Sequence, residues 1–113
     1  MVTPSAGAVV LVPFPFSDLS KSKLRPAVVL ADAGKGDWIL CQVTSNAYSD
    51  SSAIELTSNS FASGSLRTVS YARPAKLFTA NRSLPVAQAG VLTKGTLKLI
   101  VEAVIGLLRD SIK

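Results

Sequence analysis

The chain of 113 residues contains no histidine and only one cysteine, Cys41. Without histidine there can be no imidazole-based catalytic triad, no His-rich metal site and no RNA cleavage by paired imidazoles. A single cysteine cannot form an intramolecular disulfide, and because Cys41 lies in the apolar run WILCQV we expect it in the core. Carboxylates are few and scattered, and no phosphate-binding glycine motif is present, so we predict neither a metal nor a cofactor.

Long apolar runs are also missing. No run approaches the roughly 18 residues of a membrane-spanning helix. The first ten residues, MVTPSAGAVV, have neither the basic region nor the apolar region of a signal peptide. We therefore expect a cytoplasmic protein without membrane contact.

Acidic residues are absent between Glu55 and Glu102, whereas the same span contains six basic residues. The whole chain has a net charge of +5. This balance favours an anionic partner such as nucleic acid, although a stretch of one sign can equally be a solvated face.

The composition, 48% apolar and 17% charged, indicates one packed domain over residues 1–113. Apolar runs and turn residues predict strands over residues 8–14, 27–31, 38–43, 53–56 and 86–88, and two strand pieces or a bent edge strand over 67–80, interrupted by Pro74. Residues 57–65 are polar and predict a loop. A helix is expected over residues 94–109 with Thr93 as its N-cap. Its apolar stripe is expected to pack against the sheet, and part of the stripe could also serve a subunit interface. Short strands followed by one helix predict a mainly β protein, a small and strongly bent barrel with a C-terminal α-helix.

The stretch that suggests chemistry is residues 20–30, SKSKLRPAVVL. Pro26 disfavours a helical conformation at Arg25, so the guanidinium is expected on extended backbone at the mouth of a strand. Thr44 and Ser45 end another apolar run, and we predict that the two points meet. An arginine keeps its charge and its planar donors match phosphate oxygens, while a threonine hydroxyl adds a neutral donor.

One reaction is feasible with these groups alone, because RNA carries its own nucleophile, the 2′-hydroxyl. A protein that orients this hydroxyl and stabilises the crowded phosphorane can cut the chain. Asp18 is the one carboxylate in the loop before Arg25 and therefore the one candidate base there. Taken singly, Arg25 is also explained as a surface residue at a strand start, and Thr44 as a polar residue at a strand end.

Three segments in this order resemble the MazF/PemK family of toxins from bacterial toxin–antitoxin pairs. They are GAVVLVPFPFSDLSKSKLRPAVVLA at 7–31, WILCQVTSN at 38–46 and GSLRTVSYARPAKLFTANRSL at 64–84. Gly90 and Leu92, followed by an amphipathic helix, fit the ending of the family, so the resemblance covers nearly the whole chain.

The resemblance implies an SH3-like barrel of the MazF/PemK/CcdB type, a homodimer, and a metal-independent, sequence-specific endoribonuclease for single-stranded RNA. It assigns the catalytic roles to Arg25 and Thr44, and it implies products with a 2′,3′-cyclic phosphate and a 5′-hydroxyl. A cognate antitoxin that covers the RNA surface is the implied protein partner.

RNA selectivity is expected from the loop before the arginine and from the end of the third predicted strand, because single-stranded RNA is read by stacking and by hydrogen bonds to base edges. The residues expected to contact RNA are Phe16, Asp18, Ser20, Lys21, Lys23, Ser45 and Asn46. Two other functions remain open. A related group of toxins on this fold poisons DNA gyrase without cutting RNA, and a plain RNA-binding barrel could use Phe16 and Tyr48 for stacking.

Overall fold

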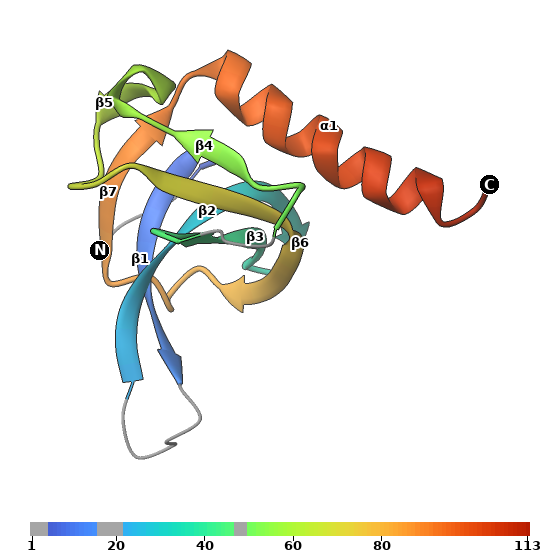
Figure 1. The fold of residues 1–113 in the computed structure, drawn as a ribbon. Coiled ribbons are helices and arrows are strands. Elements are labelled where there is room, and N and C mark those ends of the chain that lie inside the picture. The colour runs from blue at the N-terminus through green and yellow to red at the C-terminus, as the bar shows by residue number, and fades with distance from the viewer. Residues whose placement is uncertain (1–4, 16–21, 47–49) are drawn as a thin grey trace.

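The computed structural model describes residues 5–15, 22–46 and 50–113 (Figure 1). Seven strands, one short 3-10 helix and one α-helix are formed by this part of the chain. In chain order they are β1 (Ala8–Pro15), β2 (Ser22–Gly34), β3 (Asp37–Thr44), β4 (Ile54–Leu56), η1 (Ser58–Ser60), β5 (Phe61–Gly64), β6 (Ser70–Asn81), β7 (Ala87–Leu92) and α1 (Lys94–Asp110).

All the strand pairs are antiparallel, and the strands form one sheet in the order β4-β6-β3-β2-β1-β7-β5. The sheet curls into a nearly closed barrel, and α1 lies across one side of it (Figure 1). The prediction of a small bent barrel with a C-terminal helix is confirmed.

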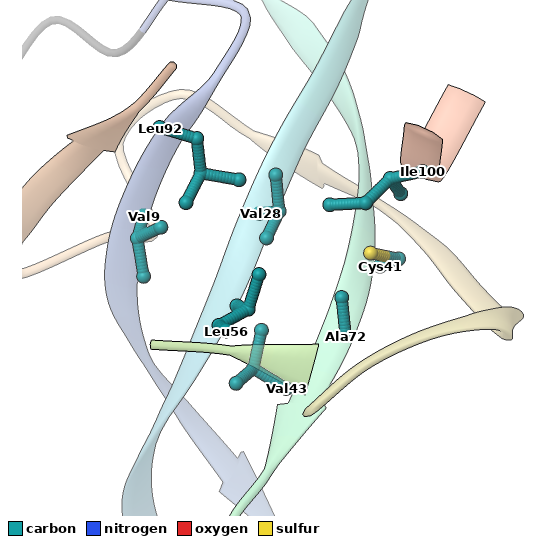
Figure 2. Close-up of a cluster of buried hydrophobic side chains, with 8 residues drawn as sticks. All are labelled: Val9, Val28, Cys41, Val43, Leu56, Ala72, Leu92 and Ile100. Atoms are coloured by element: carbon teal, nitrogen blue, oxygen red, sulfur yellow. The ribbon is translucent and has the colours of Figure 1, made fainter. Parts of the chain in front are cut away.

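The core of the barrel is a cluster of buried side chains that come from six strands and from α1 (Figure 2). Ile100 reaches into this cluster from the helix and is fully buried. Cys41 lies in the same cluster, as predicted, and burial raises the pKa of its thiol to about 12. A thiol in this state is a small core residue and not a nucleophile.

A second apolar cluster covers the other face of β1, β2 and β3. Its buried members are Ala8, Val10, Val12, Ala27, Val29 and Leu40. Successive residues of β2 alternate between the two clusters, since Val28 belongs to the first and Val29 to the second. These strands are therefore buried on both faces, which explains their nearly continuous apolar sequences.

β2 begins earlier than the sequence predicts. Residues 22–26 were expected to lie in or next to a loop, but they continue the strand because β1 pairs with them out to Pro15 and Ser22. In Figure 1 the paired ends of β1 and β2 extend away from the barrel. Beyond Leu11, β1 has lost its pairing with β7, so the prolines at positions 13 and 15 fall where one side of the strand is an edge.

β6 is one continuous strand, with a register shift opposite the segment between Cys41 and Val43 on its partner β3. Pro74 lies at this irregularity and is buried. The prediction of a bent strand is thus confirmed. The strand is an edge in its second half only, because its first half lies between β3 and β4.

The expected loop over residues 57–65 is wrong in part, because it contains η1 and β5. β5 pairs with β7 at a very close approach: a Cβ on Gly90 would lie 2.5 Å from the carbonyl oxygen of Ser63, and one on Gly64 would clash with Ala89. Gly64 also has a φ of +68°. Only glycine meets both demands, so this strand depends on a long-range glycine pair that local polarity does not reveal.

α1 begins as predicted, with the Thr93 hydroxyl accepting a hydrogen bond from the backbone N–H of Thr96 at 3.2 Å. The apolar stripe packs against the barrel in part: Ile100 lies in the core cluster and Leu97 packs against it. Ile100 is the one buried residue of the helix, and the second half of α1 runs past the barrel into solvent (Figure 1). No helix formed by the described residues is long and apolar enough to cross a membrane.

Candidate functional site

Arg25 lies within β2, opposite Val12 of β1, and its side chain is half-buried. The extended backbone expected from Pro26 is present, but the cause is pairing along the strand as well as the proline. Lys23, two residues earlier, is exposed.

Thr44 ends β3, opposite Tyr71 of β6. Its hydroxyl closes a tight turn: it accepts from the backbone N–H of Asn46 at 3.1 Å and donates to the carbonyl oxygen of Asn46 at 3.0 Å. Ser45 and Asn46 are both exposed in this turn. The hydroxyl proton of Thr44 therefore already has a backbone acceptor, and the hydroxyl would have to rotate before it could donate to a phosphate.

The register of β2 on β3 relates the two predicted catalytic positions. The last pair of the β2–β3 ladder at this end of the sheet joins Ala27 to Gln42. Arg25 and Thr44 each lie two residues beyond this pair, Arg25 within β2 and Thr44 at the end of β3. The two points expected to meet therefore lie on neighbouring strands at the same end of their ladder, and their contact stays a prediction.

A groove of about 400 Å³ opens beside Arg25. We call this concavity of the protein surface, as distinct from a groove of nucleic acid, the major groove of the site. It is lined by Leu11, Leu24, Arg25, Pro26, Val43, Ser45, Ser65, Leu66, Arg67, Thr68, Ser70 and Ala89. Thr44, Lys23 and Asn46 are not among the lining residues.

The lining of the major groove is electrostatically one-sided. Among the described residues, the lining contains two arginines and four hydroxyl side chains, and no carboxylate. The arginines come from separate elements, Arg25 from β2 and Arg67 from the segment between β5 and β6. A concave surface that combines fixed positive charge with hydroxyl donors suits a phosphate group.

Arg67 is the residue that the sequence did not assign to the site. It is one of the six basic residues between Glu55 and Glu102, but nothing in that part of the sequence indicates which of the six lies at the groove that Arg25 lines. Leu66 and Thr68 line the groove on either side of it, so the whole segment forms one wall. Among the described residues, no ion pair or hydrogen bond holds the Arg67 side chain.

A partly buried ion pair anchors the segment that follows Asn46. Asp50 accepts a hydrogen bond from Nε of Arg73 at 2.8 Å and two more from Ser52, and its side chain is only 10% exposed. The hydrogen bond from Arg73 is the main reason why the pKa of Asp50 lies below its usual value. This pair fixes the end of the β3–β4 connection to β6.

Four of the residues expected to bind RNA, Phe16, Asp18, Ser20 and Lys21, lie outside the described residues, as does Tyr48. The role of Asp18 as a base stays a prediction. Within the described part of the chain, no group of three histidine, cysteine or acidic side chains is arranged to hold a metal ion.

The barrel with its C-terminal helix is the fold of the MazF toxins. Over 96% of this chain and 97% of the other, it superposes on MazF in the MazE–MazF complex of Deinococcus radiodurans with a TM-score of 0.74 and 23% identity. An endoribonuclease in complex with its cognate antitoxin from a mycobacterial species gives a TM-score of 0.71 at 15% identity, with 96% and 95% of the two chains covered. The toxin MazF-mt6 of Mycobacterium tuberculosis gives 0.65 at 12% identity, with 88% and 96% covered.

Neither a scan against protein-family models nor a search of curated proteins gave a match. The solved structures are below 25% identity to this chain, so what they establish is its MazF-type fold.

Proposed function

We propose that this protein is the toxin of a toxin–antitoxin pair and a metal-independent, sequence-specific endoribonuclease for single-stranded RNA. The observation that supports this most directly is the major groove, where Arg25 and Arg67 line one concavity whose described lining residues include no acid. The MazF-type fold and the resemblance of three sequence segments to that family point the same way. Because the proposed substrate is cellular RNA, we expect the activity in the cytoplasm.

In the proposed reaction the 2′-oxygen of one nucleotide attacks the adjacent phosphorus while the bond from phosphorus to the 5′-oxygen breaks. The 2′-hydroxyl loses its proton and the leaving 5′-oxygen gains one, which gives a 2′,3′-cyclic phosphate and a 5′-hydroxyl. Arg25 donates to the non-bridging oxygens as negative charge develops on the phosphorane. Thr44 supplies a second donor after its hydroxyl leaves the carbonyl oxygen of Asn46.

The test is to incubate the purified chain with a mixed pool of single-stranded RNA in the presence of a chelator and to map the new ends. We expect cleavage at a preferred sequence, with 2′,3′-cyclic phosphate on one side and 5′-hydroxyl on the other. Bound but intact RNA would overturn the enzyme and favour an RNA-binding barrel. Failure both to bind and to cut would favour a toxin directed at a protein such as gyrase.

The antitoxin partner is proposed on the same electrostatic ground. A groove whose described lining contains two arginines and no carboxylate fits an acidic, partly extended protein segment as well as it fits RNA. An acidic peptide added to the RNA reaction should therefore inhibit cleavage competitively. Simultaneous binding of RNA and peptide would count against a shared groove.

We propose a homodimer that uses the exposed end of α1. Four apolar side chains there are open to solvent in the single chain: Ile105, Leu107, Leu108 and Ile112, at 37, 40, 64 and 83% exposure. A group of apolar side chains of this size on a helix that leaves its own barrel is typical of a subunit interface.

Replacement of Leu108 by lysine is expected to convert a dimer into a monomer, because it places a charge in the middle of these side chains. The measurement is the molar mass in solution by light scattering at several concentrations. Lys98→Ala, which changes an exposed side chain elsewhere on α1, is the control and should leave the mass unchanged. A parent protein that is monomeric at every concentration would rule out the dimer.

A further inference from the structure

A second, smaller groove of about 240 Å³ lies on the other side of the wall that carries Arg67. We call it the minor groove of the site. Leu66, Arg67 and Thr68 line both grooves, so this one segment separates them. The remaining lining comes from the end of β4, from the start of η1 and of β5, and from Val69, and nothing in the proposed reaction uses it.

The chemistry of the minor groove differs from that of the major groove. Half-buried Phe61 provides an aromatic side chain, and Thr57, Ser58 and Thr68 provide hydroxyls. The Thr57 oxygen accepts from the backbone N–H of Asn59 at 3.3 Å, which leaves its own proton to donate elsewhere. One charged side chain lines the groove, Arg67 at its border with the major groove.

The walls of the minor groove are fixed by contacts that need no ligand. Thr57 and Ser60 form a capping box around η1, with the Thr57 N–H donating to the Ser60 hydroxyl at 3.0 Å. Phe61 packs against the core of the barrel and opposite Leu92 on β7. A site with such walls is formed before binding, so little ordering free energy is lost when a ligand enters.

We propose that the minor groove binds one base of the single-stranded RNA, while Arg67 binds the phosphate that joins this nucleotide to the one in the major groove. This inference rests on the proposed function, since it names how the same enzyme would read its substrate. It adds a specificity subsite and gives Arg67 a substrate-binding role separate from that of Arg25.

The size and lining of the groove favour a base over other ligands. Cavities that enclose drug-sized ligands measure roughly 300–1,000 Å³, so a groove of about 240 Å³ suits a smaller planar group. Unstacked bases in single-stranded RNA are bound by aromatic side chains and by hydrogen bonds to their edges, which the hydroxyls of Ser58 and Thr68 can make. The guanidinium beside them supplies the phosphate contact that a nucleotide requires.

The first experiment compares the cleavage patterns of the parent and of Ser58→Ala on a randomised RNA pool. Ser58 lines the minor groove but not the major groove, and its side chain is exposed, so its replacement should not affect folding. Loss of one hydrogen bond to a base should reduce the preference at a single position near the cut by about 3–10-fold and leave the other positions unchanged. Ser83→Ala, an exposed serine in neither groove, is the matched control and should keep the parental preference.

The second experiment measures binding, so that it is independent of cleavage. Short 2′-O-methyl RNAs, which lack the nucleophile, are made abasic at one position at a time. The parent should lose affinity for one particular abasic RNA, and Arg67→Gln should weaken binding of every RNA and reduce its salt dependence by about one counterion. Arg82→Gln, at an exposed arginine in neither groove, is the control.

The outcomes separate this inference from the proposed function. If the parent cuts RNA but Ser58→Ala keeps the same preference at every position, the base site is wrong and the ribonuclease stands. If the parent binds RNA without cutting it, the abasic series is also measured with Ser58→Ala. A smaller loss of affinity at one abasic position in Ser58→Ala than in the parent supports the base site, and identical losses at every position overturn it. A parent that neither binds nor cuts RNA overturns both.

Discussion

Arg25→Ala is expected to slow RNA cleavage by roughly 10²–10³-fold, the usual cost of removing one donor to a transition state. The guanidinium is half-buried on β2 and lines the major groove, where water screens its charge less than on an open surface. The measurement is the single-turnover rate on a defined RNA with enzyme in excess, so that binding and product release do not limit it.

Three comparisons make the Arg25 result specific. Arg82→Ala removes the same charge from an exposed turn and should leave the rate within a factor of about two, because it lies outside both grooves. Arg25→Lys should recover only part of the loss, since an ammonium cannot donate from two fixed positions. Thermal unfolding should show that Arg25→Ala is folded; a folded variant that cuts as fast as the parent would remove Arg25 from the mechanism.

Ile100→Ala is expected to lower the free energy of unfolding by about 2–5 kcal/mol, which is the cost of truncating a buried aliphatic side chain. Ile100 is fully buried and is the contact by which α1 enters the barrel core (Figure 2). Small domains have only about 5–15 kcal/mol of stability, so this change alone should bring the protein close to unfolding. The measurement is urea denaturation followed by circular dichroism at one fixed protein concentration.

The neighbouring residue on the helix provides the control for Ile100. Leu99 is 61% exposed, so Leu99→Ala removes an aliphatic side chain from the same turn without opening a cavity and should change stability by no more than about 0.5 kcal/mol. Equal losses for the two variants would mean that the helix, and not its buried contact, determines the stability. Such a result would also weaken the view that the rest of α1 is available to a second subunit.

Several features of the fold could be predicted from the sequence because they depend on near neighbours. The apolar sequences of β1 and β2 are nearly continuous, which indicates that both faces of these strands are covered. The Thr93 hydroxyl caps α1 through a contact three residues away. The end of β3 at Thr44 and the turn at Gly34 likewise follow from local residues. In each case the cause lies within one turn or one strand.

The extent of β2 and the existence of β5 could not be predicted in the same way. Residues 22–26 begin with a serine and a lysine that favour a loop, and they form strand because β1 supplies partners along their length. β5 forms because Gly64 and Gly90, distant in sequence, allow two backbones to approach more closely than any side chain permits. Long-range pairing outweighs local preference at both places.

For the site, the sequence by itself determined the chemistry: an arginine held extended before a proline, a threonine at a strand end, and no histidine to compete with them. Only the tertiary structure decided which other side chains lie beside these residues. The barrel brings Arg67 from the β5–β6 segment to the groove that Arg25 lines and places a second groove beyond it. It also leaves the end of α1 uncovered, since Ile100 is the one buried residue of the helix and the second half of α1 runs past the barrel. Such neighbours depend on how the sheet closes, which no local pattern encodes.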